Sequence, residues 1–193
     1  MKLNIGIVPH IGKKYNFFTN SVDINLLKFL NYCFKGCLTH VLVGQKVRLD
    51  LIVLSGSNTI TSLSKKKADK IRNKIDKFYF NLAIKKKIPL IGICHGAQFI
   101  AKKYKATIKK STNHAGKKHK IIFKNKKSLL VNSFHDYSIF KISKNLNTLA
   151  YSKNDKSIEY FEVKSKKIIG LMWHPERNIK FSSKDKSIFR SIL

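Results

Sequence analysis

The segment that most restricts the fold of this chain is residues 90–101, which read LIGICHGAQFIA. A short apolar run leads through Gly92 to a single thiol at Cys94, and helical spacing begins after Gly96. This order is typical of a buried strand, a tight turn and a helix. A Cβ at either glycine would crowd the neighbouring strand or helix. We therefore predict that Cys94 lies at the apex of a strained turn, with a helix N-terminus that favours its thiolate.

Apolar runs and helical periodicities alternate in the first half of the chain. We predict strands at residues 3–8, 38–43 and 49–54, and helices at residues 21–35 and 65–87. Ser21 and Asp23 stand where the cap of the first helix is expected. In the second helix, lysines fill the outer face, and the apolar stripe contains Ala68, Ile71, Ile75, Phe78, Leu82 and Ala83. The alternation predicts a mostly parallel central sheet with helices on both faces.

The character of the sequence changes after Tyr104. Short β-like runs separated by Asn and Lys turns occur at residues 120–123, 128–131, 157–163 and 168–173. We expect these runs to form short antiparallel strands, and we expect residues 182–193 to form a closing helix capped by Ser182 or Ser183. With 193 residues and no repeat or linker, the chain is expected to form a single α/β domain over residues 1–193.

The formal net charge of +30 raises the question of a nucleic-acid partner. Lys, Asn and Ile are abundant along the whole chain, and all three have A/T-rich codons, so genome composition accounts for much of the excess. The lysines mostly flank apolar runs, and no basic motif is interleaved with aromatic residues. We therefore predict no nucleic-acid partner, and we expect the positive field to serve a small anionic substrate.

The location of the protein is predicted from its ends and its thiols. No run of about 18 apolar residues occurs, so no membrane insertion is expected. Residues 1–9 are better interpreted as a first strand than as a signal peptide. Three cysteines do not suggest a disulfide framework, and Cys33 and Cys37 are expected to be half-buried or buried thiols. The expected location is the cytoplasm.

A candidate base and its orienting group follow an apolar run in the segment WHPE, residues 173–176. His174 is expected at the end of a strand. In an extended segment Glu176 would project to the same side, so it could receive one ring N–H and direct the other nitrogen of His174 toward Cys94. Taken alone, the segment is more typical of a surface turn that contains a His and a Glu.

Backbone donors for an oxyanion are expected beside this thiol. The segment 54–58 reads LSGSN at the end of an apolar strand, where Gly56 would let the backbone come close. We predict that the amides of Ser57 and His95 form the oxyanion site. An ordinary strand-to-loop turn would have the same sequence.

Further polar residues are candidates for substrate binding. Gln98 lies one turn into the predicted helix, and residues 132–135 read NSFH after a short strand. The substrate-binding candidates are Gly56, Gln98, Asn132, Ser133, Phe134 and His135. No metal site is predicted from Cys94, His95 and His174, because adjacent ligands point in different directions and no spaced Cys/His pair supports them. No cofactor is predicted.

Taken together, these segments resemble the class I glutamine amidotransferase family, and within it the γ-glutamyl hydrolase branch. The resemblance rests on G-x-C-x-G-x-Q at residues 92–98, on H-P-E at residues 174–176, on residues 55–58 and on residues 132–135. It implies a flavodoxin-like α/β sandwich and a γ-glutamyl substrate. It further implies that Cys94 attacks the δ-carbonyl to form a thioester, and that His174 with Glu176 transfers the proton.

The family resemblance does not identify the leaving group of the γ-glutamyl substrate. Small stand-alone members from surface-polysaccharide gene clusters, which hydrolyse γ-glutamyl-CDP-amidate in capsule synthesis, are also similar to this chain at residues 113–114, 118–120, 132–135 and 172–177. That likeness implies a nucleotide-linked substrate, with His114, His119 and His135 along the path of its pyrophosphate. The alternative is a glutaminase subunit that supplies ammonia to a partner synthetase. A non-catalytic relative is a third interpretation, against which the intact Cys94, His174 and Glu176 argue.

Overall fold

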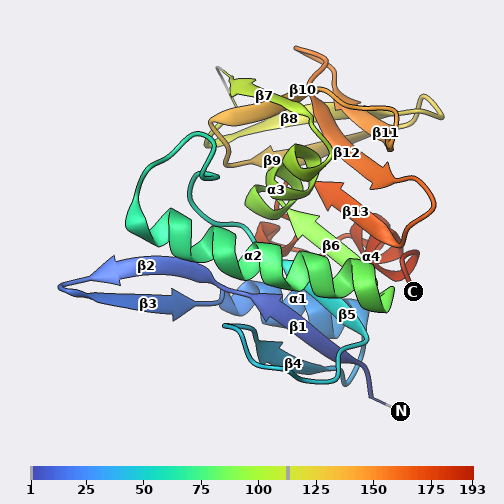
Figure 1. The fold of residues 1–193 in the computed structure, drawn as a ribbon. Helices are drawn as coiled ribbons and strands as arrows, with labels where there is room; N and C mark the ends of the chain where they lie inside the picture. Colours follow the sequence, from blue (N-terminus) through green and yellow to red (C-terminus); the bar gives the residue numbers. More distant parts are fainter. Residues whose placement is uncertain (1, 112–113) are drawn as a thin grey trace.

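The computed structural model describes residues 2–111 and 114–193 (Figure 1). In this part of the chain the strands form an 11-stranded sheet and a separate two-stranded hairpin. The sheet has a parallel half and an antiparallel half, and helices cover both faces of the parallel half (Figure 1). This arrangement confirms the α/β fold class predicted from the sequence.

Apolar strands form the parallel half of the sheet. In spatial order they are β4 (Leu38–Val41), β1 (Asn4–Val8), β5 (Leu51–Leu54), β6 (Leu90–Ile93) and β13 (Ile168–Leu171). All neighbouring pairs among them are parallel. The strands β5, β6 and β13 are buried at every position, as continuous apolar runs are when helices cover both faces of a sheet.

The antiparallel half continues from β13 to the other edge. Its strands are β12 (Ile158–Val163), β11 (Leu146–Ser152), β8 (Lys117–Phe123) and β9 (Ser128–Ser133), with β10 (Tyr137–Lys141) and β7 (Thr107–Lys110) branching from β12. The β-like runs in the sequence coincide with β8, β9, β12 and β13. The last of them differs from the expectation of antiparallel strands, because β13 is antiparallel to β12 but parallel to β6. The strands β7, β10 and β11 were not assigned in the sequence analysis.

Two pairs of helices cover opposite faces of the sheet. On one face lie α1 (Ile24–Cys33) and α4 (Ser183–Arg190), and on the other lie α2 (Lys67–Lys86) and α3 (His95–Lys103). The predicted caps are confirmed, because Asp23 accepts a hydrogen bond from Asn25 N and Ser182 accepts from Lys184 N. None of the described helices is both long and apolar enough to cross a bilayer.

The orientation of α2 differs from the prediction. The predicted stripe included Phe78, which is 40% exposed, whereas Asp69, Arg72 and Asp76 are buried. The helix is therefore turned so that charged side chains face the sheet. The physical reason is that Arg72 and Asp76 pair with each other and with groups at the ends of the strands, as described below.

A hairpin that the sequence analysis did not predict follows β1. Its strands are β2 (His10–Lys14) and β3 (Phe17–Ser21), which pair only with each other and project beside α2 (Figure 1). Most of its residues are exposed, so the hairpin lacks the alternation of buried and polar residues by which a strand is detected.

The turn between β6 and α3 is built on two close backbone approaches. A Cβ placed on Gly92 would lie 2.6 Å from Ala97 N and 2.6 Å from the Gly96 carbonyl carbon. A Cβ on Gly96 would lie 2.1 Å from the carbonyl oxygen of Leu54 in β5. The first turn of α3 therefore rests directly on β5 and β6, which only glycine at these positions permits.

The close approach at Gly92 predicts a large loss of stability when a methyl group is added. Gly92→Ala should lower the free energy of unfolding by about 3 kcal/mol, because backbone atoms must move to relieve the overlap. Urea denaturation followed by far-UV circular dichroism measures the change. The matched control is Gly12→Ala in the hairpin, where the nearest atom is the Thr19 hydroxyl at 3.3 Å. Equal denaturation midpoints for the two variants would contradict the packing described here.

Candidate active site

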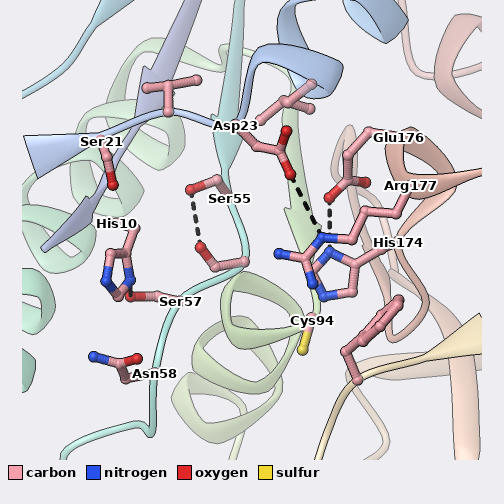
Figure 2. A pocket seen from close by; sticks show the side chains of 14 residues that line it. His10, Ser21, Asp23, Ser55, Ser57, Asn58, Cys94, His174, Glu176 and Arg177 are labelled. Atoms are coloured by element: carbon pink, nitrogen blue, oxygen red, sulfur yellow. Dashed lines mark hydrogen bonds and ion pairs between the residues drawn. The ribbon is translucent and has the colours of Figure 1, made fainter. Parts of the chain in front are cut away.

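The predicted site residues gather at the carboxyl ends of the parallel strands. Cys94 follows β6, Ser55 follows β5, His174 lies three residues after β13 and His10 begins the hairpin just after β1 (Figure 2). Ligand sites in open α/β sheets occur at this edge. A cavity of about 500 Å³ lies here, lined by all four of these residues.

Cys94 has the strained backbone conformation expected of the turn. Its φ is +48° and its ψ is −99°, and its amide donates to Leu171 O over 2.7 Å. A positive φ is costly for a residue with a Cβ and persists only where the surroundings enforce it. The thiol stands at the first turn of α3. All three cysteines are free, and burial raises the pKa of Cys33 to about 12 and raises the pKa of Cys37.

His174 and Glu176 form the expected pair, although not for the expected reason. Nδ1 of His174 lies 2.7 Å from Oε1 of Glu176, and both side chains are buried (Figure 2). The prediction assumed an extended segment. Instead, a 3-10 turn, η1 (Pro175–Arg177), begins after His174 and brings the carboxylate beside the ring.

The surroundings of His174 favour its protonated form. Burial lowers the pKa of the ring, but the hydrogen bond and charge of Cys94 and then those of Glu176 outweigh burial and raise the pKa to about 9. Such a pair of thiol and imidazole can hold a proton on the histidine while the sulfur carries negative charge.

The backbone of His174 is held by Asn132 at the end of β9. The amide nitrogen of Asn132 donates to His174 O over 2.7 Å, and its amide oxygen accepts from His174 N over 2.9 Å. Phe134 adds an edge contact to the His174 ring, with centroids 5.6 Å apart. The guanidinium of Arg177 lies over Phe134 and forms an ion pair with Asp23 at 3.5 Å.

The turn at residues 55–57 lies against His174. A Cβ on Gly56 would lie 2.5 Å from Cε1 of His174, so glycine is required for this approach. The hydroxyl of Ser55 lies 2.6 Å from Val8 O and 3.2 Å from Gly56 O. Because the carbonyl and N–H of a trans peptide point in opposite directions, the Ser57 N–H points away from Ser55. His10 Nδ1 pairs with the Ser57 hydroxyl at 3.1 Å.

A buried charge network fixes this turn relative to α3. Arg72 donates to Ser55 O and to Pro9 O, each over 2.8 Å, and to Asp76 over 2.9 Å. Asp76 also lies 3.0 Å from Nε2 of His95, whose Nδ1 faces Asn58 O at 3.0 Å. Burial raises the pKa of Asp76, but Arg72 and His95 outweigh it and hold the pKa below its usual value.

A second cavity, of about 340 Å³, lies on the other side of Cys94. The two cavities share Ser57, Asn58, Cys94 and Phe134. Gln98 lines the second cavity, and its amide nitrogen donates to Tyr137 O over 2.9 Å. Its charged lining residues are Lys66, Asp69 and Asp136, and His135 also lies in its wall.

Some predicted binding residues lie elsewhere. Neither Asn132 nor Ser133 lines either cavity, because the Asn132 amide is used by the His174 backbone and Ser133 is buried. His114 and His119 also line neither cavity and instead lie around the buried carboxylate of Glu159. Asn113 lies outside the described residues.

Other residues of the site were missed by the sequence analysis. His10, Asp23 and Arg177 line the larger cavity, and Arg72 and Asp76 hold its wall. A signal existed for His10, because it follows the first parallel strand as Ser55 follows another. No local pattern distinguishes Arg72 and Asp76 from the exposed charges of α2.

Comparisons with known proteins identify the family to which the chain is similar. The family model for glutamine amidotransferase class-I matches residues 39–192. A γ-glutamyl-CDP-amidate hydrolase of Campylobacter jejuni is 39% identical over 126 residues, which cover 65% of this chain and 62% of that protein. A glutamine-hydrolysing GMP synthase of Borreliella burgdorferi is 37% identical over 134 residues, which cover 65% of this chain but 24% of that protein.

Solved structures with low sequence identity share the fold. A glutamine amidotransferase from Thermotoga maritima superimposes with a TM-score of 0.68 at 18% identity, covering 99% of this chain and 84% of that chain. The structure of PurLQS from Thermotoga maritima gives a TM-score of 0.74 at 18% identity, covering 100% of this chain and 98% of that chain.

The environment of His174 leads to a prediction about its titration. In the Cys94→Ser variant, the pKa of His174 should fall from about 9 toward its ordinary value of 6.5, because the largest raising influence is removed while burial still lowers the pKa. A pH titration of ring-labelled histidines by NMR measures the midpoint. His40, which pairs with Asn4 away from the cavities, serves as the internal reference. An unchanged His174 midpoint would show that Cys94 does not act on the ring.

The charge network leads to a prediction about stability. Asp76→Asn removes the buried charge between Arg72 and His95, and it should lower the free energy of unfolding by about 3 kcal/mol. The matched control is Asp50→Asn, whose carboxylate accepts from Asn4 N at a half-buried site and whose replacement amide oxygen can still accept. We expect the control to change stability by less than about 1 kcal/mol. Equal losses in both variants would contradict a special role for the network.

Proposed function

Because the chain belongs to the class I glutamine amidotransferase family, we propose that it is a cysteine-dependent hydrolase that cleaves a γ-glutamyl amide or phosphoramidate bond and releases glutamate. The observation that carries the proposal is the arrangement of Cys94, His174 and Glu176 in the wall of one cavity. A nucleophile, a base and an orienting carboxylate in this order are the constellation that acyl transfer requires.

In the first half of the proposed reaction, the Cys94 thiolate attacks the δ-carbonyl carbon of the γ-glutamyl group. A tetrahedral intermediate forms, and its collapse breaks the bond to the leaving nitrogen, which takes a proton from His174. In the second half, His174 accepts a proton from water, which attacks the thioester carbonyl. Collapse of the second tetrahedral intermediate breaks the C–S bond, releases glutamate and restores the Cys94 thiolate beside protonated His174. Glu176 keeps the ring oriented through both halves.

The oxyanion of each intermediate needs donors that are fixed before the reaction. We assign this role to the amides of His95, at the start of α3, and Ser57, whose N–H points away from Ser55. Arg72 holds the turn of Ser57 through Ser55 O, and Asp76 links the same guanidinium to the His95 ring. Preorganised donors of this kind contribute about 3 kcal/mol each to the stabilisation of a transition state.

The two cavities that meet at Cys94 suggest which part of a substrate each cavity binds. The smaller cavity, with Gln98 and the charges of Lys66, Asp69 and Asp136, suits the amino-acid end of the γ-glutamyl group. The larger cavity, with His10 and Arg177, suits an anionic leaving group. Its volume of about 500 Å³ lies within the usual range for sites that bind small molecules. We therefore place the γ-glutamyl-CDP-amidate of capsule synthesis first among substrates, as the Campylobacter jejuni relative suggests.

A second candidate function uses the same chemistry. The similarity to glutamine-hydrolysing GMP synthases supports a glutaminase that passes ammonia to a partner synthetase. In either case we expect a small-molecule substrate, no nucleic-acid partner and no need for a cofactor in the chemical step. Three free thiols fit the reducing conditions of the cytoplasm, which is the location that we propose.

The proposal predicts glutamate release from γ-glutamyl compounds. Purified protein should release glutamate from γ-glutamyl-CDP-amidate, and Cys94→Ala should lower the rate by roughly 10³-fold or more because the nucleophile is lost. The matched control is Cys37→Ala, a half-buried thiol outside both cavities, which should keep the wild-type rate. Glutamate is measured by a coupled dehydrogenase assay.

Parallel assays with L-glutamine and γ-glutamyl p-nitroanilide separate the two candidates. Release from the nucleotide-linked substrate alone supports the hydrolase, whereas glutamine hydrolysis that appears only with a co-purifying synthetase supports the amidotransferase subunit. Folded protein that releases glutamate from none of the three compounds contradicts the hydrolase, and it contradicts both candidates if the synthetase also restores no release.

A further inference from the structure

A second cluster of ionisable side chains lies in the antiparallel half of the sheet, apart from the proposed catalytic residues. Three histidines surround one glutamate there: His114 just before β8, His119 on β8, His135 after β9, and Glu159 on β12. Their exposed fractions are 5%, 6%, 3% and 0%. Polar side chains that are so well buried need hydrogen-bond or metal partners, because an unpaired polar group loses its hydration on burial.

The three rings direct nitrogen atoms toward the same carboxylate oxygen. Oε1 of Glu159 lies 3.3 Å from Nε2 of His119, 3.7 Å from Nε2 of His135 and 3.8 Å from Nδ1 of His114. The facing atoms of His114, His119 and Glu159 all lie within 4.8 Å of one another. Within the described part of the chain, none of these three ring nitrogens has a hydrogen-bond partner.

A conventional hydrogen-bonded cluster does not account for these positions. A protonated histidine bound to a carboxylate lies about 2.7–2.9 Å from it, as His174 does from Glu176. The three ring nitrogens around Glu159 are farther away, at 3.3–3.8 Å from the same oxygen. Four ligands about 2.0–2.1 Å from a tetrahedral ion lie roughly 3.3 Å from one another. The distances from Oε1 of Glu159 to the three ring nitrogens, 3.3–3.8 Å, are close to this value.

Surrounding residues orient two of the three histidines, His114 and His135, as the outer partners of ligating histidines do in metal sites. His114 directs Nε2, the nitrogen that does not face Glu159, to Oδ2 of Asp155 over 2.9 Å. Asp155 in turn accepts from both the backbone and the hydroxyl of Ser157. His135 directs Nδ1 toward the hydroxyl of Ser138 at 3.4 Å. A carboxylate behind a ligating histidine fixes the ring and its tautomer.

We propose that His114, His119, His135 and Glu159 bind one Zn²⁺ ion in a closed structural site. Imidazole and carboxylate ligands suit Zn²⁺, and four protein ligands leave no open position for catalysis. The expectation of no metal considered only Cys94, His95 and His174. The four residues proposed here are spread over 46 positions of the sequence (159 − 114 + 1), and only His114 and His119, with four residues between them in an H-x4-H spacing, form a close pair of the kind found in zinc motifs.

Such an ion would affect the catalytic cavity without touching the substrate. It would tie residues 132–135, at the end of β9 and just after it, to β8 and β12 through His135. The same stretch carries Asn132 and Phe134. Asn132 holds the backbone of His174, and Phe134 contacts the His174 ring. The ion is therefore a positioning element, and its presence does not depend on which substrate is cleaved.

Metal content and metal-dependent stability test the site directly. Protein purified without chelators should contain about one Zn²⁺ per chain, as measured by elemental mass spectrometry. Removal of the ion with dipicolinate should lower the Tm, and added Zn²⁺ should restore it. The His119→Ala/Glu159→Gln double variant should hold less than about a tenth of the wild-type zinc and show no rise in Tm with added Zn²⁺. The matched control is His40→Ala/Glu162→Gln, whose glutamate is on the same strand but faces Asn147.

Cobalt substitution distinguishes this site from metal bound at the thiols. Co²⁺ added to stripped wild-type protein should give the visible absorption of a tetrahedral ion without a thiolate charge-transfer band, and Cys94→Ser should leave the spectrum unchanged. The proposal is overturned if stripped wild-type protein neither binds Zn²⁺ nor gains in Tm. It is also overturned if the double variant retains the zinc or if Cys94→Ser loses it. The wild-type titration remains decisive even where the double variant does not fold.

Discussion

The buried guanidinium of Arg72 is the contact on which the geometry around Cys94 depends. Parallel strands that end at the same edge leave carbonyl groups without ladder partners, and Arg72 donates to those of Pro9 and Ser55 after two neighbouring strands. Through Asp76 it also reaches the ring of His95, the residue after Cys94. One side chain therefore sets the distance between the turn at Ser57 and the start of α3. A charge that is costly to bury is tolerated here because Arg72 donates hydrogen bonds to Pro9 O, to Ser55 O and to the Asp76 carboxylate.

The remaining parts of the site are fixed from the other half of the sheet. His174 follows β13, the last parallel strand, and its backbone is bound by Asn132 from the antiparallel strand β9. The pairing of β13 with β6 brings His174 to the same edge as Cys94. Cys94 and His174 thus follow two adjacent parallel strands, while the backbone of His174 is held by the antiparallel half. This division explains why a site at one edge requires the whole sheet to be formed.

The sequence predicted the parts of this arrangement that local patterns encode. Buried runs revealed β1, β5, β6 and β13, and the Gly-x-Cys-x-Gly spacing revealed the turn at Cys94. The side of α2 that faces the sheet was not predictable from the sequence. Asp69, Arg72 and Asp76 are indistinguishable from surface charges until their tertiary partners are known. The same holds for Asn132, whose partner is 42 residues away. The contact of Glu176 was predicted for the wrong reason, since a 3-10 turn and not an extended chain produces it.

The separation of the hairpin from the main sheet has a consequence for how such proteins diverge. The strands β2 and β3 pair only with each other, yet the hairpin brings His10 and Ser21 into the wall of the larger cavity (Figure 2). Its length and side chains can therefore change during evolution without shifting the register of any strand that carries Cys94 or His174. Natural variation in this hairpin offers a route by which the ligand preference of the cavity changes while Cys94 and His174 stay in place.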